Sequence, residues 1–110
     1  MTPSPDATAP LTALPLRGRS GVRLSGSCDL DTRQALSSVL SVVAGMPGAV
    51  VHLDLSTVPF FDAASVAALV RTSAALSDQG RRLLLHDPPY SLRRVVEMFP
   101  DECAALEVAA

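Results

Sequence analysis

Apolar residues recur along this chain with two different spacings. Three segments place them three or four positions apart, the spacing that gathers side chains on one face of an α-helix. The segments between them hold short apolar runs, and the longest of these, Ala49–Leu55, is interrupted only by His52 and Asp54. Such a run, with β-branched Val50 and Val51, is typical of a strand buried in the middle of a parallel sheet. The pattern therefore predicts alternating strands and helices.

Polar residues and breakers predict where three helices begin and end. Asp31 and Gln34 have the spacing of a capping box, and Gly45 and Pro47 are expected to end the first helix. Asp62 is the expected N-cap of the second helix. The first predicted helix has the apolar face Leu36, Val39, Leu40 and Val43. The second predicted helix spans Ala63–Asp78 and is capped by Gly80. The third lies between the turn Asp87-Pro88-Pro89 and Pro100, and its apolar face is Leu92, Val95, Val96 and Phe99.

Shorter apolar runs predict the other strands. Leu11–Leu16 is expected at a sheet edge because it contains a proline, and the turn residues 17–21 would join it to Val22–Ser25 in a hairpin. Arg82–His86 is a further strand, and Leu106–Val108 is expected to be a last short one. The order β-β-α-β-α-β-α-(β) predicts an α/β domain with a mostly parallel sheet of four to five strands and three or more helices.

The chain of 110 residues, 48% of them hydrophobic, fits one domain with a real core. Residues 1–10, MTPSPDATAP, are rich in Pro, Ser, Thr and Ala and cannot bury enough apolar surface to offset the entropy of ordering. We therefore expect a flexible arm over residues 1–10 and a single domain over residues 11–110.

Charge and cysteine content narrow the class of protein. The net charge of −2 gives no electrostatic footprint for nucleic acid or for an anionic membrane. Cys28 and Cys103 are too few and too far apart for a disulfide framework or a zinc site, which favours a reduced, cytoplasmic setting. No apolar run is long enough to span a bilayer, and no signal peptide is evident. A soluble intracellular protein without direct membrane insertion is expected.

The junction between the central strand and the second helix is the most informative part of the sequence. A helix N-terminus offers free backbone N–H groups, and here it carries Asp62, Ala63, Ala64 and Ser65. Asp62 is read first as an N-cap, with orientation of a partner or of magnesium as the alternative. Ser65 is read first as a hydroxyl that bonds back to this cap, with a displaced phosphorylation site as the alternative. For Asp29, a partner contact and a place just before the first helix's capping box are equally open.

Other candidates for chemistry are weaker. His52 is expected to be a satisfied strand residue, and the pair His86 and Asp87 is explained as well by a turn as by catalysis. A reactive Cys28 thiol would need a nearby cation. The sequence contains no nucleophile–base constellation and no glycine-rich phosphate loop. We expect no enzymatic activity, no cofactor and no metal.

Four segments together resemble one known family. They are Gly26-Ser27-Cys28-Asp29, the stretch LDLSTVPFFD over residues 53–62, the spacing from there to Gly80 and the strand RLLLH, and Ser91-Leu92-Arg93-Arg94-Val95-Val96. In order and spacing they are similar to the STAS domain family, named for sulfate transporters and anti-sigma factor antagonists, over about Leu14–Val108. The resemblance implies a protein that acts by binding. Soluble bacterial members bind anti-sigma factors that double as serine kinases, and phosphorylation after the strand-end Asp switches the antagonist off.

The chain departs from the family pattern at this switch. The family has Asp-Ser-Ser/Thr-Gly, so the phosphoacceptor position here is Ala63, which has no hydroxyl, and Ala64 follows it. Ser65 stands where the family has Gly, and Ser27 replaces a family Glu. The usual phosphorylation switch is therefore not expected to work.

The resemblance implies an anti-sigma factor antagonist whose partner is a kinase-type anti-sigma factor. The departure at Ala63 leads to the hypothesis that this kinase does not switch the antagonist off. The alternatives are an accessory subunit of a lipid or anion transporter and a self-associating signalling scaffold, and a homodimer is left open. The expected contact surface spans Thr57–Leu69 with Asp29 beside it, and its residues are Asp29, Thr57, Phe60, Asp62, Ala63, Ala64, Ser65, Val66 and Leu69.

Overall fold

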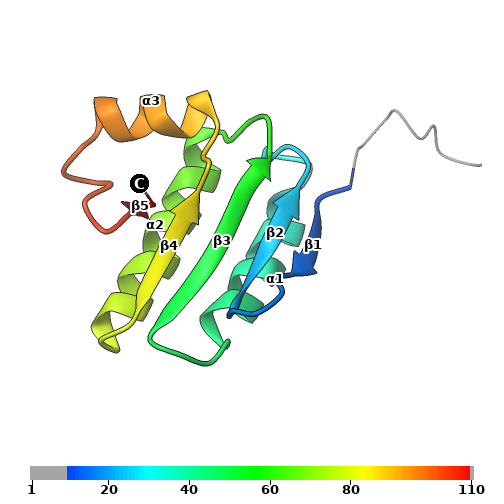
Figure 1. Cartoon of the computed structure of the whole chain (residues 1–110). Helices are drawn as coiled ribbons and strands as arrows, with labels where there is room; N and C mark the ends of the chain where they lie inside the picture. The colour runs from blue at the N-terminus through cyan, green and yellow to red at the C-terminus, as the bar shows by residue number, and fades with distance from the viewer. Residues whose placement is uncertain (1–9, 110) are drawn as a thin grey trace, which may run out of the picture.

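The computed structural model describes residues 10–109, which form one five-stranded sheet with three helices (Figure 1). The first strand, β1, pairs antiparallel with β2, whereas β2, β3, β4 and β5 are parallel to one another. The strands lie across the sheet in the order of the sequence. They are β1 (Thr12–Pro15), β2 (Gly21–Ser25), β3 (Val50–Thr57), β4 (Arg82–His86) and β5 (Glu107–Val108).

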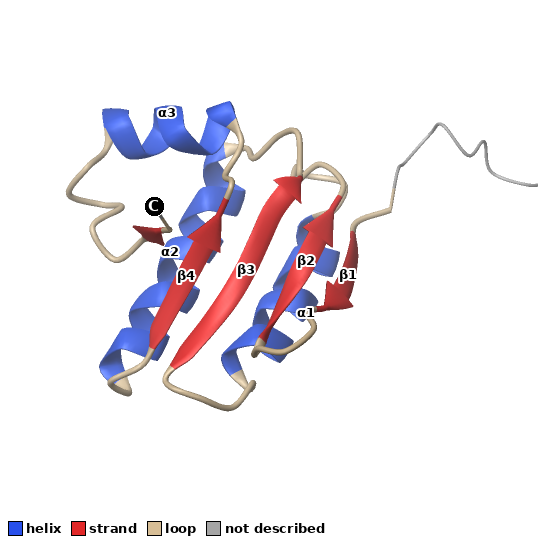
Figure 2. Cartoon of the chain, viewed as in Figure 1, coloured by secondary structure: helices blue, strands red, loops and turns tan. Residues whose placement is uncertain are grey.

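The helices α1 (Arg33–Ala44) and α2 (Ala63–Asp78) lie side by side on one face of the sheet, behind the strands in Figure 2. The third helix, α3 (Tyr90–Met98), crosses beyond the carboxyl end of β4. Within residues 10–109, no helix covers the opposite face of the sheet. The domain is therefore a two-layer α/β structure with one open sheet face.

The predicted order of elements and the mostly parallel sheet are confirmed. The central strand is longer than expected because Ser56 and Thr57 continue it past the apolar run. Apart from Pro10, the expected flexible arm over residues 1–10 lies outside the described residues.

The core lies between the sheet and the two helices. Alternate residues of β3, namely Val51, Leu53 and Leu55, are fully buried, and Leu83 and Leu85 of β4 lie beside them. This is the period-two pattern of a strand with one face packed. The helices close the core from the other side with buried side chains that include Leu36, Leu40 and Val43 of α1 and Val66, Leu69 and Leu76 of α2.

The predicted end of α2 is confirmed in its detail. The N–H of Gly80 donates to the carbonyl of Ser77, and the N–H of Arg81 donates to that of Leu76, both at 2.9 Å. These are the two bonds of a Schellman motif, and Gly80 has the positive φ of 70° that this ending requires. The helix therefore stops where the sequence places the glycine.

The predicted apolar face of α3 is only partly buried. Leu92 is fully buried, Val95 and Val96 are half-buried, and 47% of Phe99 is exposed. The helix covers the end of the sheet rather than its face, so one side of it stays open.

Candidate functional site

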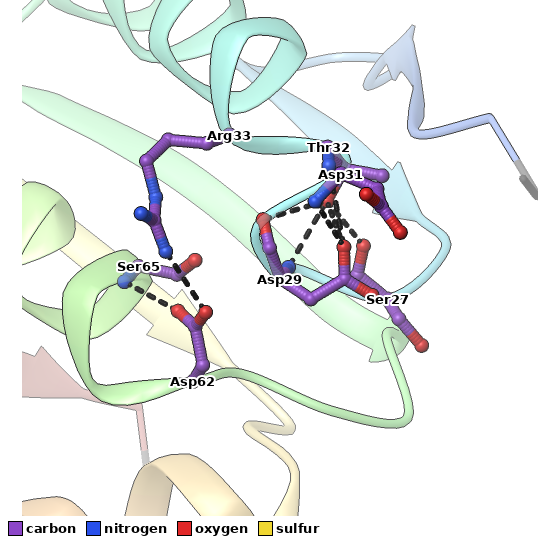
Figure 3. A network of polar contacts seen from close by, with 7 residues as sticks. All are labelled: Ser27, Asp29, Asp31, Thr32, Arg33, Asp62 and Ser65. Atoms are coloured by element: carbon purple, nitrogen blue, oxygen red, sulfur yellow. Dashed lines mark hydrogen bonds and ion pairs between the residues drawn. The ribbon is translucent and has the colours of Figure 1, made fainter.

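Two loops meet at the carboxyl ends of β2 and β3. The main chain of Cys28 pairs with that of Phe61 as an isolated parallel bridge. The N–H of Cys28 donates to the carbonyl of Phe60 at 2.8 Å, and the N–H of Asp62 donates to the carbonyl of Cys28 at 2.9 Å. The loop before α1 and the loop before α2 are therefore held side by side (Figure 3).

Asp62 begins α2 and ties it to α1. One carboxylate oxygen accepts from the backbone N–H of Ser65 at 2.8 Å, which confirms the predicted N-cap. The other accepts from Arg33 Nη2 at 2.9 Å (Figure 3). Burial acts to raise the pKa of Asp62, but hydrogen bonding from Ser65 and the charge of Arg33 outweigh it and hold that pKa below its ordinary value. The carboxylate is thus charged and engaged on both oxygens.

Asp29, not Asp31, organises the start of α1. Its Oδ1 accepts from the N–H groups of Asp31 and Thr32 at 3.0 and 3.2 Å, and the hydroxyl of Thr32 donates to the carbonyl of Ser27 at 2.8 Å. The predicted capping box of Asp31 and Gln34 is therefore wrong, because the helix starts later, at Arg33. A turn built by Asp29 satisfies the free N–H groups ahead of the helix instead.

The expected contact residues divide into an exposed set and a buried set. Ser65 and Val66 are 1% exposed and Leu69 is fully buried, so these side chains belong to the core. Within residues 10–109 the Ser65 hydroxyl has no hydrogen-bond partner, so the expectation that it bonds back to the cap is wrong; the backbone N–H of Ser65 makes that bond instead. The exposed or half-exposed set is Asp29, Thr57, Phe60, Asp62, Ala63 and Ala64.

Sequence reasoning missed two residues that fix this surface. Arg33 reaches Asp62 from another element, and the Ser91 hydroxyl of α3 accepts from the N–H of Phe61 at 2.8 Å. Neither contact has a signal in sequence spacing, since the partners are about thirty positions apart. Together they fix the loop before α2 from both sides.

A pair of histidines lies away from these loops, on the open face of the sheet. Nδ1 of His52 on β3 and Nε2 of His86 on β4 are 2.8 Å apart, so the rings share a hydrogen bond. Burial, together with the nearby Arg19 and His86, lowers the pKa of His52 below its ordinary value. His86 is thus a partner of His52, and the turn residue Asp87 that follows has a positive φ of 52°.

The two cysteines of the chain are both buried, and burial raises the pKa of each thiol. Burial and the neighbouring charges of Asp29 and Asp62 raise the pKa of Cys28 to about 12, which makes it an inert thiol at neutral pH. Residues 10–109 contain no group of three or more His, Cys, Asp or Glu side chains placed to hold a metal ion. None of the helices in the described chain is both long and apolar enough to cross a membrane.

Comparisons with solved structures show the same fold. The chain superposes on the anti-sigma factor antagonist SpoIIAA in its unphosphorylated form with a TM-score of 0.62 at 16% identity, covering 91% of this chain and 88% of the other. The phosphorylated form of the Bacillus cell fate determinant SpoIIAA gives a TM-score of 0.63 at 16% identity, covering 91% of each chain. A sulfate transporter family protein from Wolinella succinogenes gives a TM-score of 0.61 at 25% identity, covering 94% of this chain and 82% of the other.

Sequence comparison agrees with the fold. No curated protein is similar enough in sequence to count as a relative. The family model described as "Mlab, STAS domain" matches residues 15–100, which include both loops of the site and all elements from β2 to α3. The chain therefore belongs to the STAS domain family.

Proposed function

We propose that this chain is a non-enzymatic regulatory module, of the anti-sigma factor antagonist type, that binds a kinase-type anti-sigma factor in the cytoplasm. One observation carries the proposal. The start of α2 is exposed at Ala63 and Ala64 and is held rigidly beside the Asp29 loop by the Cys28–Phe61 bridge. A preorganised surface loses little conformational entropy on binding, which favours a protein contact.

The proposed contact surface is the exposed set alone: Asp29, Thr57, Phe60, Asp62, Ala63 and Ala64. Phe60 is the one bulky apolar group in it, with 44% of its surface exposed. Aromatic side chains flanked by polar groups are common anchors of protein interfaces. The buried Ser65, Val66 and Leu69 support this surface from beneath.

The proposal includes the loss of the phosphorylation switch. Ala63 has no hydroxyl to accept phosphate, and the nearest hydroxyl in α2, that of Ser65, is buried at 1% exposure. A kinase would have to unwind the first turn of α2 to reach it. A phosphate works in such a switch by adding roughly two negative charges to a packed interface. Without an acceptor, the antagonist stays in its binding state.

The test is calorimetric titration with the kinase-type anti-sigma factor encoded in the same genome, with and without Mg²⁺·ATP. We expect the wild type to bind in both conditions and to take up no radiolabelled phosphate. Ala63→Ser restores an acceptor hydroxyl, so it should bind without ATP, become phosphorylated with ATP and then dissociate. Ala64→Arg should abolish binding because it places a long cation in the proposed contact.

A matched control is Ala75→Arg, an exposed alanine of the same helix three turns further on. It should bind like the wild type. Failure of the wild type to bind, or equal loss in Ala64→Arg and Ala75→Arg, would refute the proposed partner or surface. Label on wild-type Ser65 would refute the claim that the switch is lost.

A second candidate function is supported by the comparisons. The matching family model bears the description "Mlab, STAS domain", and one similar structure is a sulfate transporter family protein. The chain would then be an accessory subunit of a lipid or anion transporter, using the same surface on an ATPase subunit. Co-purification of transporter subunits with the wild type and not with Ala64→Arg would favour this function over the first.

A further inference from the structure

A groove of about 330 Å³ lies between α2 and the segment formed by α3 and the loop after it. Its floor is one stripe of α2 that includes Ala63, Ala67 and Val70, and its wall includes Val95, Phe99 and Cys103. In Figure 1, α3 crosses beyond the end of the sheet and does not lie along α2. The groove is almost entirely apolar and no described part of the chain covers it.

The groove has a protruding aromatic side chain on its wall and a stretch of small side chains on its floor. Phe99 stands on its wall with 47% of its surface exposed, a large fraction for an aromatic ring. Ala63 and Ala67, four residues apart on one face of α2, leave a stretch of helix with almost no side-chain bulk. A ring from outside can therefore approach the helix backbone closely at Ala67.

The rim carries one charge of each sign. Arg71 extends from the α2 side and Glu102 from the loop after α3. Among residues 10–109, neither takes part in an ion pair, whereas Arg23, Arg33, Arg82 and Arg94 all do. The groove thus presents a cation, an anion, a ring and a hollow within one patch.

We propose that this groove is the interface of a homodimer, formed with a second copy of this chain about a twofold axis. A twofold interface is isologous: if residue i contacts residue j, then j contacts i. A patch that carries a cation, an anion, a ring and a hollow offers each of these groups a counterpart on the second copy. Arg71 of each copy faces Glu102 of the other, and Phe99 of each copy packs on Ala67 of the other.

The dimer has a consequence for the site described above, although it does not depend on the proposed function. Ala63 belongs both to the groove and to the exposed surface at the start of α2. A dimer that covers Ala63 therefore competes with any partner that contacts it. Self-association would therefore make the availability of this surface depend on the concentration of the chain. Phosphorylation cannot regulate the same surface because Ala63 has no hydroxyl.

The test is sedimentation velocity on the purified chain alone, from low micromolar to millimolar concentration. We expect the wild type to move from the mass of one chain, 11.5 kDa, toward twice that mass. Arg71→Glu and Glu102→Arg should each weaken the dimer by roughly tenfold or more, because each places like charges opposite one another. The double variant Arg71→Glu/Glu102→Arg should restore it, since the exchanged charges again face opposite charges.

Asp101→Arg is the matched control, because Asp101 is exposed next to Glu102 but does not line the groove. It should dimerise like the wild type. Ala67→Trp tests the hollow separately and should abolish the dimer, with circular dichroism to show that the fold is kept. A wild type that stays monomeric, or a dimer that the double variant does not restore, would overturn the proposal without bearing on the anti-sigma factor titration.

Discussion

At the scale of single residues, Asp62 connects local structure to the site. One of its oxygens caps α2 and the other holds Arg33 of α1, so a single carboxylate fixes the start of one helix and its distance to the next. An exposed ion pair alone contributes little to stability, at most about 1 kcal/mol. The cap therefore contributes the larger part of the stabilisation by Asp62, and the ion pair mainly fixes the position of α2 relative to α1.

Replacing Asp62 by Ala should therefore destabilise the domain by about 1–2 kcal/mol, the range for a lost cap plus a small ion-pair contribution. Urea denaturation measures the loss. The control is Asp31→Ala, because the Asp31 side chain is exposed and makes no hydrogen bond within residues 10–109. Equal losses for the two variants would mean that charge reduction, and not the cap, is responsible.

The histidine pair predicts a dependence of stability on pH. The pKa of His52 is lower in the folded chain than its ordinary value of 6.5, so the unfolded chain binds this proton more readily. Its contribution to stability is therefore complete above about pH 6.5 and is lost as the pH falls from there through the lowered value. Asp54 and Asp62, whose pKa values are also lowered, lose their contributions in a separate window below their ordinary value of 3.8.

Nuclear magnetic resonance can test this cleanly, since the chain has only two histidines. The His52 ring should titrate below 6.5, and Arg19→Gln should raise its midpoint because one of the charges that lower it is removed. Arg17→Gln, in the same turn, is the control and should leave the midpoint unchanged. A His52 midpoint at or above 6.5 in the wild type would contradict the lowered pKa and the pH dependence of stability argued from it.

Residue-scale contacts mark the limit of what the sequence could predict. The Asp62 cap could be predicted because a cap and its helix are neighbours in sequence. Arg33 and His86 could not be assigned to Asp62 and His52, because each pair is joined only by the sheet and the helix packing. The capping box of Asp31 failed for a related reason: Asp29 accepts from the Asp31 N–H that Gln34 would bond in a capping box, and spacing alone does not decide between them.

At the scale of elements, the pairing of β2 with β3 depends on a close backbone approach. Gly21 has a φ of 149°, and a Cβ at this position would lie 2.0 Å from the carbonyl oxygen of His52. The strand backbones would have to separate to admit any side chain there. This requirement explains why β2 begins with a glycine directly after its turn.

Gly21→Ala should therefore destabilise the domain by several kcal/mol or prevent folding, as expected when strain is combined with a backbone clash. Gly18→Ala is a matched control in the same hairpin. Its φ is also positive, at 76°, but a Cβ there would meet no atom within 4 Å. It should cost only about 1–2 kcal/mol, the steric penalty of the left-handed conformation. Thermal denaturation of the two variants would show whether the clash or the dihedral angle dominates.

At the scale of the whole molecule, the fold was predictable because the buried apolar residues of each strand and helix recur with the period of that structure. Alternation along β3 and β4, helical spacing in α1 and α2, and the Gly80 ending all agree with one topology. The spacing of apolar residues could not predict the direction in which α3 crosses the sheet. Its apolar residues fit a buried face, yet it crosses the sheet end and leaves Phe99 half exposed.

The two cysteines lie in parts of the domain that are expected to differ in local stability. Cys28 is fully buried between the two loops, where its backbone bonds join the loop that follows β2 to the loop that follows β3. Cys103 is 5% exposed and lies beside α3 and β5, which is only two residues long. Regions with few packed contacts open locally at lower free energy than the core. The segment from α3 to β5 should therefore open before the rest of the domain unfolds.

Iodoacetamide labelling followed by mass spectrometry should distinguish the two cysteines. Both thiols should be protected in the native chain, since burial raises the pKa of each and only the thiolate reacts. In moderate urea, Cys103 should react first, and Cys28 should react only along the global unfolding curve. Cys103→Ser keeps the Cys28 signal separate as a control. If both cysteines instead react along one curve, α3 and β5 belong to the same cooperative unit as the central sheet, and the domain unfolds as a single body.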